Sequence, residues 1–295
     1  MKQKIAMGQV SATKSRQENL AKAVRMMEQA AAKGAKLICF PEVGFDRFFP
    51  QKRADTDLFK LAEPIPGPIV DRIAAESRRL GIVAIVSLLE EAQPGEYYDS
   101  AACIDSDGSL LGQTRMTHTF EGENYNEKFY YGPGNTHYPV YKTEAGSVGI
   151  AICQDSWFPE VMRALAMRGA ELIVIPTAES CHPEEYDWYS DVLTTVQGKA
   201  PAVYNGVFVG MANRVGTEEN MSFMGSSYVT NPFGVVLARA NRDTDELLVV
   251  EIDTDEIRRA RQRWPLLRDR RPDTYEVLLQ AWGSRVDFDP ARVIT

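Results

Sequence analysis

One cysteine, Cys153, lies where a nucleophile would be expected. It follows a short apolar run, residues 147–152, that is typical of a buried strand, and it precedes residues 159–168, whose apolar positions have helical spacing. A sharp turn between strand and helix would expose the sulfur and direct the backbone N–H groups of Gln154 and Asp155 at the atom that the sulfur attacks. Alternatively, Cys153 is an ordinary buried apolar side chain, as many unpaired cysteines are.

Glu42 is a second residue that could do chemistry. It comes after K-L-I-C-F, residues 36–40, which is predicted to be a buried strand, so it also lies at the carboxyl end of a strand. A buried carboxylate whose pKa lies near neutrality can accept the proton of a thiol. The alternative is a solvated carboxylate on a loop, which is the usual state of a glutamate.

The elements that would position these residues alternate along the chain, which favours one α/β domain over residues 1–295. Helices are predicted from a capping box of Ser15 and Glu18 to Gly34 and at 69–80, 159–168, 183–205 and 255–263. Strands are predicted at 5–10, 36–40, 82–89, 98–104, 110–115, 147–152, 171–176, 207–213, 224–230, 235–240 and 247–252, with a hairpin across 105–108.

Three other segments have distinct predictions. The loop at 43–50 contains three phenylalanines and either walls a pocket beside Glu42 or plugs the core. The irregular stretch at 116–140 is long enough to be functional. Residues 255–295 are predicted to form a C-terminal helix and a tail that packs on a partner subunit, with 270–275 and 286–290 extended.

Composition excludes several classes of function. The net charge of -8 and the lack of a basic stripe argue against nucleic acid as a partner. No apolar run approaches the length of a membrane span and the first residues hold no apolar signal core, so we expect a soluble, cytoplasmic protein. The four cysteines and three histidines lack metal-ligand spacing, and no G-x-G-x-x-G follows a strand, so neither a metal nor a dinucleotide cofactor is expected.

Several motifs together resemble the carbon-nitrogen hydrolase (nitrilase) superfamily, and most closely its branch of N-carbamoylputrescine amidases and related N-carbamoyl hydrolases. The motifs are F-P-E at 40–42, Y-D-S-A-A at 98–102, N-E-K-F-Y-Y-G-P-G at 126–134, I-C-Q-D-S-W-F-P-E at 152–160, I-P-T-A at 175–178, A-N-R at 212–214 and D-R-R-P-D-T-Y at 269–275. The resemblance covers almost the whole chain. It implies a four-layer α-β-β-α sandwich that forms a homodimer through its outer helices.

The resemblance also implies a Glu-Lys-Cys triad and no cofactor. Glu42 matches the family's general base, Cys153 its nucleophile, and Glu127 a further glutamate of the pocket. The lysine is absent: where members carry Y-R-K-x-H this chain reads T-R-M-T-H, residues 114–118, which places Met116 at the lysine position. Methionine fills the same space without a charge or a donor, so we expect the fold to survive and hydrolysis to be severely weakened.

The implied function is hydrolysis of an amide or N-carbamoyl group in a small molecule through a cysteine thioester, with release of ammonia or an amine. Gln154, Trp157 and Phe48 are the candidate substrate contacts, although Trp157 and Phe48 could equally be core residues. Acidic side chains could attract an amine or form a solvated face, namely Glu121, Glu123, Glu179, Glu184 and Glu185. The alternative function is a non-catalytic relative that binds an amide or ureide or serves as a dimeric interaction platform. A third possibility is that Met116 is an introduced change that traps substrate.

Overall fold

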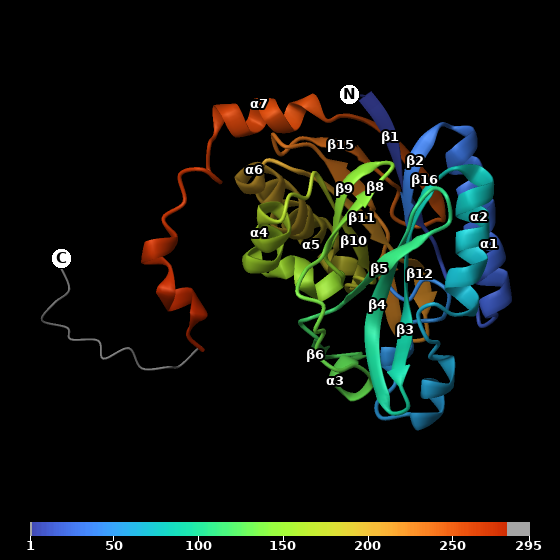
Figure 1. The fold of residues 1–295 in the computed structure, drawn as a ribbon. Coiled ribbons are helices and arrows are strands. Elements are labelled where there is room, and N and C mark those ends of the chain that lie inside the picture. Colours follow the sequence, from blue (N-terminus) through green and yellow to red (C-terminus); the bar gives the residue numbers. More distant parts are fainter. Residues whose placement is uncertain (1, 282–295) are drawn as a thin grey trace, which may run out of the picture.

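Two six-stranded sheets form the centre of the molecule in the computed structural model, which describes residues 2–281 (Figure 1). The first sheet has the order β16-β1-β2-β3-β4-β5, from Glu246–Asp253, Lys2–Gln9, Ala35–Cys39, Val83–Gln93, Glu96–Ile104 and Leu110–Arg115. The second has the order β15-β14-β11-β10-β9-β8, from Val236–Arg239, Tyr228–Thr230, Phe208–Asn213, Leu172–Thr177, Gly146–Ile150 and Val140–Thr143. The inner strands β1, β2 and β3, and likewise β9, β10 and β11, are parallel.

Helices cover the outer face of each sheet. Helices α1 (Arg16–Ala32) and α2 (Pro68–Leu80) lie on the first sheet, whereas α4 (Pro159–Met167), α5 (Tyr186–Leu193) and α6 (Ala200–Asn205) lie on the second (Figure 1). Apolar side chains from both sheets form one buried cluster, which includes Met7 of β1 and Val174 of β10. The predicted four-layer α-β-β-α sandwich is therefore confirmed.

Local signals set the ends of the first helices. The Ser15 hydroxyl accepts a hydrogen bond from the backbone N–H of Glu18 at 3.3 Å, as an N-cap should. Gly81 ends α2 with φ +63°, a left-handed conformation that costs glycine little.

The structure corrects three predicted elements. Residues 183–205 are not one helix but a 3-10 turn (Pro183–Glu185), α5, a π-helical segment (Thr194–Lys199) and α6. Residues 224–230 are not one strand, because Gly225 and Ser226 adopt positive φ and separate β13 (Met221–Met224) from β14. Residues 270–275 are not extended but contain a 3-10 turn (Pro272–Thr274), and 286–290 lie outside the described residues.

The stretch at 116–140 is more ordered than its composition indicates. It contains a small hairpin, β6 (Glu121–Gly122) with β7 (Tyr125–Asn126), and a single helical turn, α3 (Glu127–Tyr130). A second hairpin is made by β12 (Val215–Glu218) and β13. Both hairpins lie outside the two large sheets.

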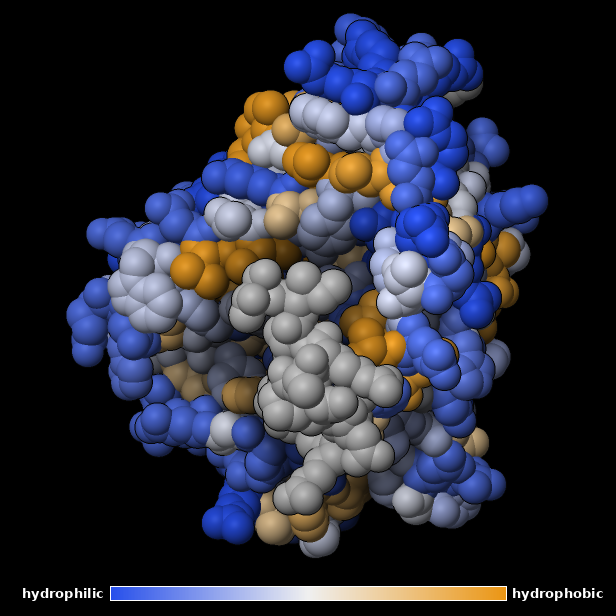
Figure 2. Space-filling model, turned by 90° about the vertical axis from the view of Figure 1, so that its left-hand side faces the viewer, coloured by the Kyte–Doolittle hydropathy of each residue, from blue (hydrophilic) through white to orange (hydrophobic). Residues whose placement is uncertain are grey.

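The C-terminal helix α7 (Asp255–Arg263) has the bounds that its sequence predicts, and the chain beyond it runs along the side of the second sheet's helices (Figure 1). Together with α4 and Tyr204 of the α6 region, residues 266–279 line a groove of about 1070 Å³. Figure 2 shows apolar side chains gathered on this face inside a hydrophilic rim. Exposed leucines at 278 and 279 contribute to it.

Candidate active site

Cys153 lies where the predicted turn places it, between β9 and α4. It is the first residue of the 3-10 turn Cys153–Trp157. Its φ is +40°, which is rare for a residue with a side chain and typical of strained positions in functional sites. The Thr177 hydroxyl, at the end of the neighbouring β10, donates to the sulfur at 3.2 Å. The Asp155 N–H donates to the Ile152 carbonyl at 2.8 Å within the turn, which corrects its expected role and leaves the N–H of Gln154 as the candidate donor to a ligand.

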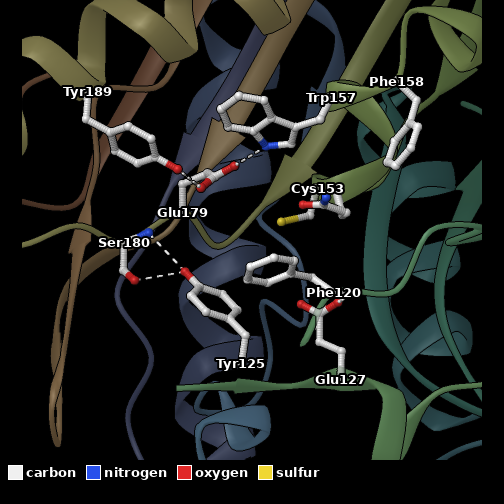
Figure 3. Close-up of a pocket in the computed structure, with 10 residues that line it drawn as sticks. Phe120, Tyr125, Glu127, Cys153, Trp157, Phe158, Glu179, Ser180 and Tyr189 are labelled. Atoms are coloured by element: carbon white, nitrogen blue, oxygen red, sulfur yellow. Dashed lines mark hydrogen bonds between the residues drawn. The ribbon is translucent and has the colours of Figure 1, made fainter. Parts of the chain in front are cut away.

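The sulfur of Cys153 faces a pocket of about 320 Å³ (Figure 3). Its lining residues come from the turn, from the small hairpin and the residues next to it, from the segment after β10 and from α5: Phe120, Tyr125, Glu127, Cys153, Gln154, Trp157, Phe158, Glu179, Ser180 and Tyr189. Of the residues predicted for the site, Cys153, Glu127, Gln154 and Trp157 therefore meet in one pocket. No lysine or arginine is among the lining residues.

Glu179 is one of five acidic residues for which the sequence leaves open an attraction for an amine or a solvated face, whereas Phe120, Tyr125, Phe158, Ser180 and Tyr189 are pocket residues that the sequence analysis missed. Glu179 follows β10 by two residues, just after the I-P-T-A motif, and is almost completely buried. Its carboxylate accepts hydrogen bonds from Trp157 Nε1 at 3.0 Å, from Gln197 Nε2 at 3.1 Å and from the Tyr189 hydroxyl at 3.2 Å (Figure 3). These donors fix the carboxylate at the pocket surface. By contrast, Glu121, Glu123 and Glu184 are exposed.

Phe48 does not reach the pocket. It is fully buried and packs edge-on against Tyr125, with ring centres 5.3 Å apart, and against Phe223 at 5.8 Å. The prediction that Phe48 walls the pocket is wrong, because the pocket surface at this point is formed by Tyr125, and Phe48 supports that ring from behind.

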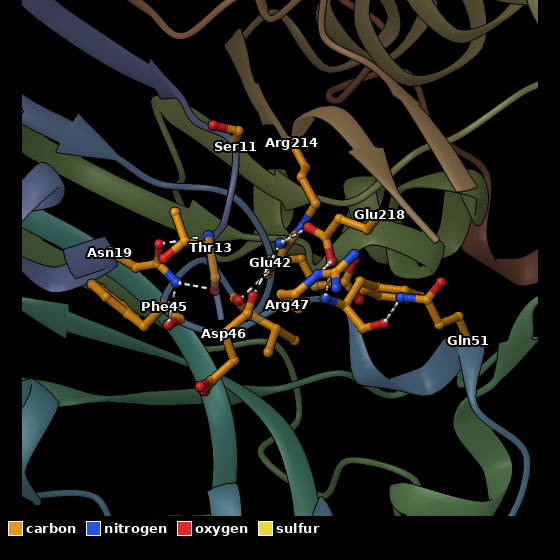
Figure 4. Close-up of polar contacts among 12 residues, drawn as sticks. Ser11, Thr13, Asn19, Glu42, Phe45, Asp46, Arg47, Gln51, Arg214 and Glu218 are labelled. Carbon is orange, nitrogen blue, oxygen red and sulfur yellow. Dashed lines mark hydrogen bonds and ion pairs between the residues drawn. The ribbon is translucent and has the colours of Figure 1, made fainter. Parts of the chain in front are cut away.

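Glu42 is completely buried rather than solvated, three residues beyond the end of β2. Neither of its carboxylate oxygens has a well-formed hydrogen bond within the described part of the chain. The backbone around it is held by Arg214, whose guanidinium donates to the carbonyl oxygens of Glu42 at 3.1 Å and Val43 at 2.7 Å (Figure 4). The same guanidinium donates to the Asp46 carbonyl at 3.0 Å and to Glu218 at 2.6 Å.

Burial and mutual repulsion raise the pKa values of the carboxyls around Cys153. Burial raises the pKa of Glu42 well above its ordinary value; the charges of Asp99 and Glu127 raise it further, and contact with the Cys153 thiol acts in the opposite direction. Burial raises the pKa of Glu127 to about 8, against the effect of the Phe120 N–H, which donates to its carboxylate at 2.7 Å. Burial also raises the pKa of Asp99 to about 6.

The same environment keeps the Cys153 thiol protonated. Burial, and then the charges of Glu42, Glu179 and Glu127, raise the pKa of the Cys153 thiol well above its ordinary value. A thiol in this state reacts only if a neighbouring base takes its proton as the sulfur attacks. Glu42 and Cys153 lie close enough for each to affect the pKa of the other.

Met116 directly follows β5 and is buried in the same apolar cluster as Cys153. Its N–H donates to the Asp99 carbonyl at 2.8 Å, and its carbonyl accepts from the N–H of Gly134 at 2.8 Å. The neighbouring cation, Arg115, turns away to pair with Glu90 at 2.6 Å. The charges with the largest effects on the pKa values of Glu42, Glu127 and Cys153 accordingly come from carboxylates.

The raised pKa of Glu127 predicts how stability depends on pH. Because the folded protein keeps this proton up to a pH of about 8, and an ordinary glutamate loses it near 4.5, stability falls as the pH rises between these values. We expect Glu127→Gln to match the unchanged protein in acid and to become more stable than it with rising pH, by up to about 1.4 kcal/mol per pH unit. Urea unfolding at a series of pH values measures the difference, and a difference that does not change with pH would contradict the raised pKa.

Comparison with known proteins identifies the class. Residues 4–262 match the model of the carbon-nitrogen hydrolase family, so the chain belongs to that family and the resemblance to the nitrilase superfamily is confirmed. The members of this family are enzymes that hydrolyse carbon–nitrogen bonds. Among residues 2–281, no helix is both long and apolar enough to cross a membrane, and no cluster of His, Cys, Asp and Glu suits a metal ion.

The similar proteins include hydrolases of ureido compounds and amides. An N-carbamoylputrescine amidase of Arabidopsis thaliana is 38% identical over 277 residues, which cover 90% of this chain and 91% of the relative. A citrullinase of Francisella tularensis subsp. tularensis is 36% identical, with 95% and 99% covered. Among solved structures, a carbon-nitrogen hydrolase from Helicobacter pylori G27 has a TM-score of 0.90 at 31% identity, with 95% and 99% covered. An amidase from Nesterenkonia sp. AN1, in complex with acrylamide, has a TM-score of 0.76 at 25% identity, with 94% and 97% covered.

Proposed function

We propose that this protein removes the carbamoyl group of a small N-carbamoyl amine through a thioester on Cys153. One observation carries the proposal: the nucleophile candidate and a fixed carboxylate, Glu179, face the same small pocket, in which only acidic groups carry charge (Figure 3). A substrate with a ureido group next to the Cys153 sulfur and an ammonium group next to the Glu179 carboxylate would fit this arrangement. The relatives that act on N-carbamoylputrescine and citrulline support the ureido half of this substrate.

The reaction follows from the roles proposed for these residues. Glu42 takes the thiol proton while the sulfur attacks the ureido carbon, and the N–H of Gln154 stabilises the oxyanion that forms. Glu42 then gives the proton to the leaving ammonia or amine, which breaks the C–N bond and leaves a thioester. Water that has lost a proton to Glu42 attacks the thioester, and the sulfur leaves with that proton. The carbamic acid that is released loses carbon dioxide, which completes removal of the carbamoyl group. Glu127 lies beside this path, and its proton keeps it from repelling Glu42.

A substrate comparison tests the proposal. Incubation with N-carbamoylputrescine, citrulline or a simple amide should give an adduct on Cys153, detected by peptide mass spectrometry, with the neutral and positively charged substrates preferred. The carboxylate of citrulline should be disfavoured, because Glu179 faces the pocket and no lysine or arginine lines it. Replacing Glu179 by Gln should weaken binding of the amine substrate more than binding of the simple amide.

The other cysteines provide the control. Cys39 and Cys103 are fully buried in the first sheet, and Cys181 lies outside the residues that line the pocket. An adduct on any of these instead of Cys153 would refute the assignment of the nucleophile. Ammonia release that persists after Cys153→Ala would do the same.

The second candidate function is a non-catalytic protein that binds a small amide or ureide. Met116 is the observation that favours it, since residue 116 carries no charge and no lysine or arginine is among the residues that line the pocket. Tight binding of N-carbamoylputrescine, without an adduct or ammonia, would be the result expected of such a protein.

We also propose that the chain works as a single-domain cytoplasmic homodimer. The apolar groove between α4 and residues 266–279, with Met167 and Leu266 exposed beside it, supports a second copy as the occupant of this face (Figure 2). A monomeric mass in solution would contradict that assembly.

A further inference from the structure

The hydroxyl of Tyr131 is a buried group that the mechanism above does not use. Tyr131 directly follows α3, is 4% exposed, and packs edge-on against Phe49 with ring centres 5.9 Å apart. Its hydroxyl has no hydrogen-bond partner within the described residues. Buried tyrosine hydroxyls usually find a partner, so one without a partner calls for an explanation.

The groups around this hydroxyl are carboxyls, and two of them have oxygens without a well-formed hydrogen bond. After burial, the charges of Asp99, Glu42 and Glu127 are the main causes that raise the pKa of Tyr131. Both carboxylate oxygens of Glu42, and one of Asp99, also have no well-formed hydrogen bond. The Tyr131 hydroxyl thus lies in the same buried region as the carboxyl oxygens of Glu42 and Asp99, which also affect each other's pKa values. Asp155 and Glu179 are the further charged groups of this region, acting on Asp99 and Cys153 respectively.

Backbone hydrogen bonds hold Tyr131 at this place. The N–H of Gly132 donates to the Tyr97 carbonyl at 2.8 Å, and the N–H of Gly134 donates to the Met116 carbonyl at 2.8 Å. Gly134 must be glycine, because a Cβ there would lie 2.3 Å from the Arg115 carbonyl oxygen. Tyr131 is therefore fixed to the ends of β4 and β5, next to Met116.

We infer that Tyr131 is a positioning residue for the general base: its hydroxyl donates a hydrogen bond to the ionised carboxylate of Glu42 and so supplies part of what a cation at residue 116 would supply. The inference rests on the proposed role of Glu42 as the base of Cys153. A phenol is neutral, so it can lie beside the apolar Met116 side chain, which itself has no donor. The bond forms when Glu42 gives up its proton and weakens when Glu42 regains it, with no change in covalent bonding at Tyr131.

Replacing Tyr131 by Phe removes only the oxygen, and the alkylation rate of Cys153 reports the effect. Iodoacetamide is small and uncharged, and its reaction needs loss of the thiol proton but no complete catalytic cycle. Without the donor, Glu42 should ionise only at higher pH. We expect the pH profile of alkylation to move up by about one unit and the rate at neutral pH to fall about tenfold. Peptide mapping would confirm that Cys153 is the residue labelled.

Two matched variants separate positioning from structure. The Tyr130 hydroxyl is used elsewhere, donating to the Lys52 carbonyl at 2.6 Å and accepting from the Asp55 N–H at 3.1 Å, so Tyr130→Phe should leave the pH profile unchanged. In a protein that carries Met116→Lys, Tyr131→Phe should have a much smaller effect, because the ammonium now stabilises the carboxylate. An unchanged profile in Tyr131→Phe, or an equal shift in both backgrounds, would overturn the inference.

The test also distinguishes this inference from the proposed function. A Cys153 that is never labelled, or whose labelling does not depend on pH, contradicts both. Labelling that follows pH and responds to Tyr131→Phe, without ammonia release from any ureido substrate in the presence of Met116→Lys, contradicts only the function.

Discussion

Replacing Met116 by Lys should raise kcat/KM for carbamoyl substrates about 10²- to 10³-fold, the usual effect of one oxyanion donor. Met116 is buried in the same cluster as Cys153, and burial together with neighbouring carboxylates raises the pKa of Glu42 and Glu127. An ammonium there would lower these pKa values and stabilise negative charge on the substrate. Ammonia release at saturating and limiting substrate would separate kcat from KM, with the gain expected mainly in kcat.

Met116→Leu is the matched control, since it keeps an apolar side chain of similar size and should leave the rate unchanged. If the unaltered protein already turns over at the rates of ordinary members of the family, or if lysine brings no gain, the reasoning about residue 116 fails. A gain that is equal in Met116→Leu would show that packing, not charge, limits the reaction.

The second large effect is expected on stability, from Arg214→Met. Arg214 is 1% exposed, pairs with the buried Glu218 at 2.6 Å, and satisfies the carbonyl oxygens of residues 42, 43 and 46. Methionine would fill the volume but would remove the positive charge paired with Glu218 and the guanidinium donors to three carbonyls, although Glu218 would keep the Phe48 N–H at 2.7 Å. Loss of one partner from a buried ion pair costs about 3 to 5 kcal/mol, and thermal or urea unfolding measures it.

Arg47 is the control for Arg214. It approaches the same Glu218 at 3.5 Å and Glu219 at 3.8 Å, but it is partly solvated. Arg47→Met should cost at most about 1 kcal/mol. A similar loss in both variants would show that Glu218 alone, and not the support of the Glu42 loop, accounts for the effect of Arg214.

The sequence predicted those parts of the site that depend on local order. The strand before Cys153, the turn after it and the following helix are contiguous, and their apolar periods are readable without other parts of the chain. The resemblance to the family predicted that Glu42 and Glu127 belong to the same site as Cys153. It also identified Met116 as the departure from the family pattern.

Contacts between residues far apart in the sequence could not be predicted from local patterns. Arg214 supports residue 42 across 172 positions of sequence, and its A-N-R motif served only to recognise the family. Asp99 lies likewise within the Y-D-S-A-A motif, which carries no local sign of a buried acid. Phe48 shows the limit most clearly, because an aromatic loop next to a candidate base fits a pocket wall and a core equally well. Only the fold reveals that the ring of Tyr125, from a distant part of the chain, separates Phe48 from the pocket.

The prediction of one continuous helix at 183–205 was wrong for another reason. Its apolar spacing is helical throughout, but the π-helical segment Thr194–Lys199 changes the turn within it. Gln197, inside that segment, donates to Glu179, so the irregular turn delivers a hydrogen bond to the pocket. Periodicity alone cannot distinguish such a turn from an ordinary one.

Backbone hydrogen bonds from Gly132 and Gly134 fix one part of the pocket wall to β4 and to the end of β5. The rest of the wall does not depend on these bonds. Residues 127–134 take their register from the sheet, whereas Tyr125, which also lines the pocket, belongs to the hairpin that precedes them, and Phe120 directly precedes that hairpin. Substrate preference could therefore diverge by exchange of the hairpin while the acid and the phenol keep their positions. The same fold would then accept new ureides and amides without a change in the residues proposed for catalysis.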